Sequence, residues 1–260
     1  MMSTAIPLRA GVLTILLLAQ WAWSLPLPDL IDKVRLSVVG VGTAYPPRQP
    51  NLKVDRVAYL ATGFVVGNGR QIVTNAHVIP PELDVGHNQS LAIFAGHGAN
   101  AMVHMAREIR RDEDHDLVLL EIQGPAMPAL QLGNSESVRE GQRIAFTGFP
   151  LGMALGLYPV THRGIVSAIA PMAQPPANSS GLNAAMIRRM RGQFSAFQLD
   201  ATAYPGNSGS PVFELGSGRV IGVINSVLVK ETREAMLAHP SGIAYAIPAK
   251  YIVPLLDPSP

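Results

Sequence analysis

Short segments rich in β-branched and apolar residues, separated by clusters of glycine, proline and asparagine, constrain the fold of this chain more than any other feature. Such segments are typical of β-strands, and the residues between them are typical of turns. The expected strands are residues 35–43, 57–67, 71–74, 91–95, 102–109, 117–122, 143–148, 164–169, 194–199, 211–214, 219–229 and 242–247. About a dozen short strands at this spacing favour barrels or sandwiches. Helix is expected at residues 232–238 and in a short C-terminal turn after Pro248.

The composition supports a folded, turn-rich chain and excludes several classes. Of the 260 residues, 48% are hydrophobic and 15% are charged, which excludes a disordered chain. A net charge of +2 implies no nucleic-acid partner. With no cysteine, the chain has no disulfide, thiolate nucleophile or cysteine-bound zinc. Six histidines show no spacing typical of metal ligands: His87, His97, His104, His115, His162 and His239. We therefore expect no metal and no cofactor.

The N-terminal residues 1–24 have the layout of a secretory signal peptide. Arg9 precedes an apolar run over residues 11–19, and small residues stand two apart at Ala22 and Ser24. The run is shorter than the roughly 20 residues of a comfortable spanning helix. We therefore expect cleavage after Ser24, export to the periplasm or the medium, and no stable membrane span afterwards. An uncleaved N-terminal membrane anchor is the alternative.

Three short segments carry chemically informative residues. His77 follows a strand in residues 73–78, an acidic cluster leads into the apolar strand 117–122, and Ser208 lies between glycines in residues 205–211. Each segment alone has an ordinary structural interpretation: a bonded histidine, a solvated acidic face and a tight turn. Together, in the order His, Asp, Ser, they match the chain order of a chymotrypsin-type triad. Within the acidic cluster, the candidates for the carboxylate are Asp112, Asp114 and Asp116.

These segments belong to a longer series of motifs in a fixed order. The motifs are Thr-Gly-Phe-Val-Val at 62–66, Thr-Asn-Ala-His-Val at 74–78, Asp-Leu-Val-Leu-Leu at 116–120, Gly-Phe-Pro-Leu-Gly at 148–152, Gly-Ile-Val-Ser at 164–167, Gln-Leu-Asp-Ala at 198–201, Gly-Asn-Ser-Gly-Ser-Pro at 206–211 and Gly-Ile-Ala-Tyr-Ala-Ile-Pro at 242–248. From residue 38 to residue 252 the chain resembles the trypsin-like serine proteases of the Deg/HtrA type.

The resemblance implies an all-β chymotrypsin-like fold of two six-stranded antiparallel barrels, with a short C-terminal helix. The N-terminal barrel half would span residues 25–135 and the C-terminal half residues 136–260, together forming one peptidase domain. Relatives often carry a C-terminal PDZ domain, and we expect none within this chain, because few residues follow Pro248.

The resemblance also assigns roles to the residues that match its motifs. Ser208 would be the nucleophile, His77 the general base and Asp116 the residue that orients His77, since Asp116 directly precedes the apolar strand as the family pattern requires. The segment Gly206, Asn207 and Ser208 would form the oxyanion hole, with the amides of Gly206 and Ser208 as donors. Many relatives have glycine where this chain has Ser210, and we expect this small residue to be tolerated.

The substrate pocket is less clearly indicated. The position six residues before Ser208, where trypsins place an acid, is Thr202. We therefore expect no preference for Lys or Arg and instead cleavage after small or medium aliphatic residues. The expected pocket residues are Thr202, Ala203, Asn225, Ser226, Val227 and Leu228.

The favoured function is a serine endopeptidase that hydrolyses polypeptide substrates through an acyl-enzyme and acts in protein quality control or processing after export. A homo-oligomer is possible. A catalytically latent or chaperone-like peptide-binding protein on the same fold is the alternative. An α/β-hydrolase esterase is disfavoured, because Ser210 replaces the last glycine of Gly-x-Ser-x-Gly and the triad order differs.

Overall fold

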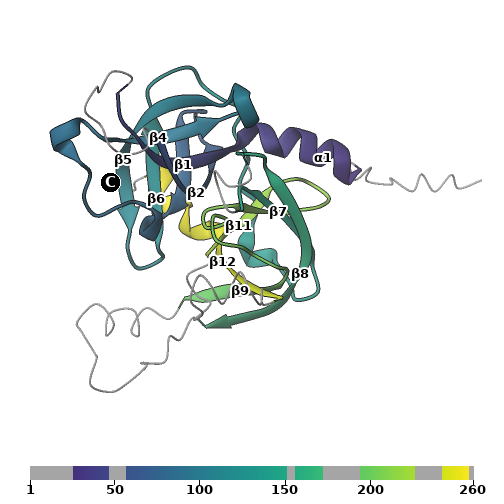
Figure 1. The fold of residues 1–260 in the computed structure, drawn as a ribbon. Helices are drawn as coiled ribbons and strands as arrows, with labels where there is room; N and C mark the ends of the chain where they lie inside the picture. The colour runs from purple at the N-terminus through teal and green to yellow at the C-terminus, as the bar shows by residue number, and fades with distance from the viewer. Residues whose placement is uncertain (1–25, 47–56, 151–155, 172–193, 226–241, 258–260) are drawn as a thin grey trace, which may run out of the picture.

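The computed structural model describes residues 26–46, 57–150, 156–171, 194–225 and 242–257, and all structural statements concern these residues. They form two closed antiparallel barrels of six strands each (Figure 1). The strand order is β1-β2-β3-β6-β5-β4 in the first barrel and β10-β11-β12-β9-β8-β7 in the second. The predicted fold class is confirmed.

The first barrel is built from β1 Val38–Ala44, β2 Val57–Val66, β3 Gln71–Asn75, β4 Ser90–Ala95, β5 Met102–Asp112 and β6 Leu117–Ile122. The second is built from β7 Arg143–Gly148, β8 Val160–Pro171, β9 Ser195–Asp200, β10 Pro211–Glu214, β11 Val220–Ile224 and β12 Ile243–Pro248. Inward-facing apolar side chains fill each barrel, because closing a six-stranded sheet buries one face of every strand.

The helices are short, and the two α-helices lie near the two ends of the described chain. They are α1 Leu27–Val34, η1 Arg35–Ser37, η2 Ala76–Val78, η3 Val85–His87, η4 Gly98–Asn100, η5 Ser135–Ser137, η9 Ala249–Tyr251 and α4 Val253–Leu256. The last two confirm the expected C-terminal helix. The expected strand 35–43 was wrong at its start, because η1 occupies its first residues, and α1 was not predicted. The expected signal peptide and the expected helix 232–238 lie outside the described residues.

Each terminal segment packs against the barrel formed by the other half of the chain. Leu30 of α1 belongs to an apolar cluster with Phe149 and Phe213, which follow β7 and lie in β10. Leu255 of α4 belongs to another cluster with Leu117 of β6. The terminal helices therefore hold the two barrels together. No helix in the described part of the chain is long and apolar enough to cross a membrane.

Candidate active site

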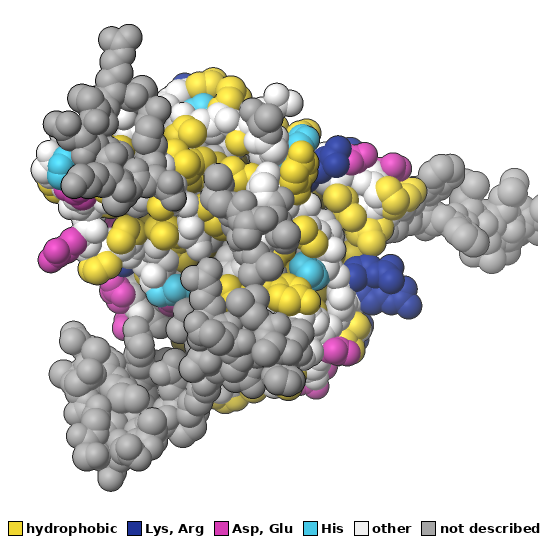
Figure 2. Space-filling view, in the orientation of Figure 1, with side chains coloured by type: hydrophobic (Ala, Val, Ile, Leu, Met, Phe, Trp, Pro, Cys, Tyr) yellow, Lys and Arg dark blue, Asp and Glu magenta, His cyan; other side chains and the backbone are white. Residues whose placement is uncertain are grey.

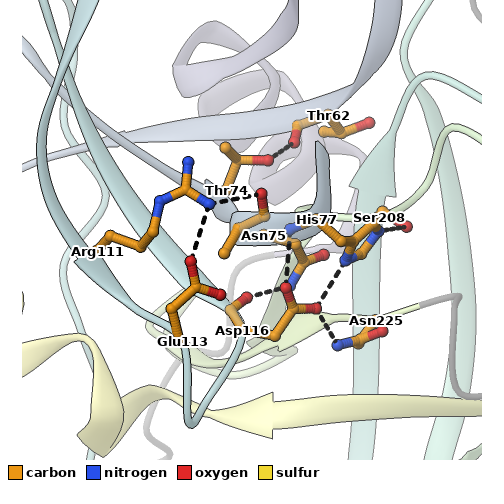
Figure 3. Close-up of polar contacts among 10 residues, drawn as sticks. Thr62, Thr74, Asn75, His77, Arg111, Glu113, Asp116, Ser208 and Asn225 are labelled. Atoms are coloured by element: carbon orange, nitrogen blue, oxygen red, sulfur yellow. Dashed lines mark hydrogen bonds and ion pairs between the residues drawn. The ribbon is translucent and has the colours of Figure 1, made fainter. Parts of the chain in front are cut away.

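His77 lies at the end of β3, on the short helix η2, and it faces the turn between β5 and β6 (Figure 3). Two hydrogen bonds from the residues that precede His77 fix this helix to the turn. The amide of Ala76 donates to the carbonyl of Asp116 over 3.1 Å, and Asn75 Nδ2 donates to the same carbonyl over 3.1 Å. The backbone carbonyl of Asp116 therefore helps to position the helix that carries His77, independently of the Asp116 side chain.

The Asp116 carboxylate makes a two-point contact with His77. Its Oδ1 accepts the backbone amide of His77 at 2.8 Å, and its Oδ2 lies 2.6 Å from His77 Nδ1 (Figure 3). Asp116 has a φ of 52°, in the left-handed region that few non-glycine residues adopt. This conformation turns the carboxylate back toward η2. Of the three aspartates that the sequence left open, Asp116 is the one that bonds His77, while Asp112 bonds His115.

Ser208 completes a continuous series of hydrogen-bonded groups. His77 Nε2 lies 3.2 Å from Ser208 Oγ, in the loop between β9 and β10 (Figure 3). The next residue, Gly209, has a φ of 84°, and a Cβ there would lie 2.0 Å from the carbonyl oxygen of Thr62. Only glycine fits this close approach of the second barrel to the first. The structure thus brings His77, Asp116 and Ser208 together as the sequence suggested.

Thr62 of β2 links the serine loop to the first barrel, a role that sequence reasoning missed. Its amide donates to the carbonyl of Ser208 over 3.0 Å, and its Oγ1 donates to the carbonyl of Gly206 over 2.7 Å. The same Oγ1 accepts the amide of Phe149 over 2.9 Å. Tyr59 Oη also donates to Gly206 O over 3.4 Å, and burial raises the pKa of Tyr59, which keeps this donor protonated.

Asn207 and Ser210 are fully buried on either side of Ser208 in the chain. The amide of Asn207 donates to the carbonyl of Tyr204 over 2.9 Å. Ser210 fits because residue 148 is glycine: a Cβ at Gly148 would lie 2.0 Å from Ser210 Oγ. The departure from the family pattern at Ser210 is thus accommodated by the missing side chain on β7.

Of the predicted pocket residues, the structure describes Thr202, Ala203 and Asn225. Asn225 donates its Nδ2 to Asp116 Oδ2 over 2.7 Å, a contact the sequence prediction did not include (Figure 3). Ala203 packs against the apolar core of the second barrel. Thr202 lines a hollow with Arg143 and Arg163. Ser226, Val227 and Leu228 lie outside the described residues.

A groove of about 910 Å³ adjoins His77 and Asp116 on the first barrel. Arg111 lies at its edge, donates to the carbonyl of Ala76 over 3.3 Å and pairs with Glu108. The hydrogen bonds that Arg111 donates to the Glu108 carboxylate raise the pKa of the Arg111 guanidinium. On the face shown in Figure 2, the described Lys and Arg side chains form separate groups rather than one basic surface. The described residues hold no cluster of three side chains suited to a metal ion.

Two six-stranded barrels with a hydrogen-bonded histidine, aspartate and serine where they meet define the chymotrypsin-like structural class. The family described as the trypsin-like peptidase domain matches residues 61–223. The chain therefore belongs to the trypsin-like peptidase family, and the resemblance seen in the sequence is confirmed.

Similar proteins belong to the DegP/HtrA group of this family. A probable periplasmic serine endoprotease DegP-like of Pseudomonas fluorescens is 32% identical over 78% of this chain and 35% of its own length. A putative serine protease HhoA of Synechocystis is 29% identical over 85% of this chain and 47% of its own length. The chain thus spans about a third to a half of these relatives. The solved HtrA-type protease AlgW with decapeptide has the same fold, with a TM-score of 0.60 and 21% identity, covering 89% of this chain and 66% of that chain.

Proposed function

We propose that this chain is a serine endopeptidase in which Ser208 is the nucleophile, His77 the general base and Asp116 the orienting carboxylate. One observation carries the proposal: the unbroken series Asp116 Oδ2, His77 Nδ1, His77 Nε2 and Ser208 Oγ, with separations of 2.6 and 3.2 Å. A serine hydroxyl is a weak nucleophile at neutral pH and needs an adjacent base, which this geometry supplies.

The reaction follows from these contacts. Ser208 Oγ attacks the scissile carbonyl while His77 Nε2 takes the hydroxyl proton, and the resulting imidazolium gives that proton to the leaving amine. This leaves an acyl-enzyme ester. Water then attacks the ester, His77 takes a proton from the water, and the same proton returns to Ser208 as the acid product leaves. Throughout, Asp116 fixes the tautomer that places the Nδ1 proton toward itself.

The amides of Gly206 and Ser208 are the proposed donors to the oxyanion. The Asn207 amide is used by the carbonyl of Tyr204, so it serves the shape of the loop instead. Thr62 supports this loop, because its Oγ1 donates a hydrogen bond to the carbonyl of Gly206 over 2.7 Å. Removing one such donor typically costs about 10²- to 10³-fold in kcat.

The proposed substrates are polypeptides in an exported compartment, cleaved after small or medium aliphatic residues. Support for the compartment comes from the names of periplasmic relatives and from the signal-like residues 1–24. Support for the preference is the threonine at position 202, where a basic-specific enzyme would have an acid. A peptide library answers this directly: cleavage mainly after Arg or Phe would contradict the proposed preference. A homo-oligomer is proposed only by likeness to the family.

A fluorophosphonate probe tests the activity, because it labels only an activated serine. The wild-type protein should be labelled and should cleave unfolded casein, whereas Ser208→Ala and His77→Ala should do neither. Ser210→Ala is the matched control, since it removes a buried serine two positions away, and it should be labelled like the wild type. A folded protein that is not labelled between about pH 6 and 9 would instead indicate a latent, peptide-binding protein.

A further inference from the structure

The turn that carries Asp116 also contains an aspartate–histidine pair, Asp112 and His115. The amide of His115 donates to Asp112 Oδ1 over 3.0 Å, and His115 Nδ1 lies 2.6 Å from Asp112 Oδ2. Each side chain is 25% exposed. We propose that His115 is a positioning residue that holds the turn so that Asp116 presents its carboxylate to His77. The inference deepens the proposed function and rests on it.

The imidazole of His115 is packed between two aromatic rings from distant parts of the chain. It stacks on Tyr251, with ring centroids 3.8 Å apart and planes inclined by 19°. The ring of Phe194 is inclined by 62° to the imidazole, with centroids 4.9 Å apart, and its centroid lies 5.4 Å from that of Tyr251. Asp112 and the two rings together fix the position and the orientation of the imidazole.

The segment that carries the stacking tyrosine is itself anchored firmly. The guanidinium of Arg110, in β5, donates to the carbonyl of Leu255. The amide of Lys250 donates to Ser135 Oγ over 3.0 Å. Leu255 is buried in one apolar cluster with Leu117, the residue that follows Asp116. The tyrosine ring is therefore a fixed platform for His115 rather than a surface side chain that rotates freely.

The backbone conformation of Asp116 depends on that of the preceding residue, His115. His115 and Asp116 share one peptide plane, and the left-handed φ of 52° at Asp116 persists only where neighbouring contacts enforce it. The carbonyl of Asp116 also accepts the hydrogen bonds from Asn75 and Ala76 that hold η2. A rotation at His115 would therefore displace both the carboxylate and the helix that carries His77.

A second Asp-x-x-His turn provides a matched control. His87 donates its amide to Asp84 Oδ1 over 3.2 Å, and its Nδ1 lies 2.8 Å from Asp84 Oδ2. The side chains of His87, on η3, and Asp84, which caps that helix, are 55% and 40% exposed and lie in a different loop. Replacing His87 with alanine removes the same imidazole–carboxylate contact as replacing His115 and keeps the backbone bond, but at a site that is not adjacent to Asp116.

The test compares four variants with the wild type on one peptide substrate. His115→Ala and Tyr251→Leu should lower kcat by about tenfold or more and leave KM within about twofold, because a displaced triad slows chemistry rather than binding. His87→Ala and Tyr251→Phe, which keeps the ring, should stay within about twofold of the wild type in both constants. If His115→Ala fails to fold, His115→Asn replaces it, with the same expected loss of kcat.

Proton NMR gives a second readout that needs no turnover. The proton between His77 Nδ1 and Asp116 should give a downfield resonance, assigned by its loss in His77→Ala. In His115→Ala this resonance should shift or broaden, while His87→Ala should leave it unchanged. If kcat and the resonance both stay as in the wild type, the positioning role is wrong. If the wild type neither cleaves nor reacts with the probe, the proposed function fails, and the resonance alone still decides the role of His115.

Discussion

Replacing Thr62 with valine removes one hydroxyl and keeps the shape of a buried β-branched side chain. That hydroxyl donates to the carbonyl of Gly206 and accepts the amide of Phe149. In the Thr62→Val variant the Phe149 amide loses this acceptor, and the Gly206 carbonyl keeps only the longer contact from Tyr59 at 3.4 Å among those described. The Gly206–Asn207 peptide, which lies between the peptides of the two proposed oxyanion donors, is then held only by Tyr59 and by the bond from the Asn207 amide to Tyr204, among the contacts described.

These hydrogen bonds set the expected losses of folding free energy and of kcat. Leaving the buried Phe149 amide without a partner costs about 1–3 kcal/mol, and losing the bond to Gly206 costs about 1 kcal/mol. The expected loss of folding free energy is therefore about 2–4 kcal/mol, which a domain of ordinary stability survives. Partial loss of one oxyanion donor should lower kcat by about 10- to 100-fold, below the full cost of removing it.

Kinetics on a peptide substrate, with urea denaturation of the same samples, separates activity from stability. Thr62→Ser keeps the hydroxyl and should recover most of kcat. Thr147→Val is the control, because Thr147 is 1% exposed and its hydroxyl bonds Thr161 of the paired strand β8 at 2.8 Å rather than the loop of Ser208. If Thr62→Val and Thr147→Val lose similar stability and both keep kcat within about twofold, Thr62 does not support the oxyanion loop.

Three further variants test other contacts. Burial lowers the pKa of His162, so below about pH 6.5 the unfolded chain binds more protons than the native one, and the free energy of unfolding should fall as the pH drops. His162→Phe should flatten that dependence in urea titrations between pH 7 and 5. Asn225→Ala should lower kcat about tenfold through lost support of Asp116, and an unchanged kcat would contradict this. Gly148→Ala should destabilise by about 1–3 kcal/mol in thermal denaturation, and adding Ser210→Gly should restore part of the loss.

Local sequence patterns predicted the bounds of several strands, because these depend on residues that are close together in the chain. The strands at 117–122, 143–148 and 211–214 have the expected bounds, because apolar runs between turn-forming residues define both ends. His77 and Ser208 were singled out because their segments, taken together in chain order, match a chymotrypsin-type triad.

Local patterns did not predict the contacts between segments that are far apart in the chain. The bond from Thr62 to Gly206 joins residues 144 positions apart, and the bond from Asn225 to Asp116 joins residues 109 apart. Asn225 was therefore assigned to the substrate pocket from its place in the sequence. Helix α1 was missed although Leu27, Leu30, Ile31 and Val34 have helical spacing, because eight residues make a marginal helix without tertiary packing.

The supports of the site cross from one barrel to the other in both directions. The loop of Ser208, in the second barrel, is held by Thr62 of the first. The turn of Asp116, in the first barrel, is held by Asn225 and by the ring of Tyr251, which come from the second half of the chain. Because the proposed nucleophile and the proposed orienting carboxylate each depend on the opposite half, the geometry of the proposed triad is a property of the docked pair of barrels. The packing of the C-terminal segment therefore contributes to the chemistry as well as to the fold.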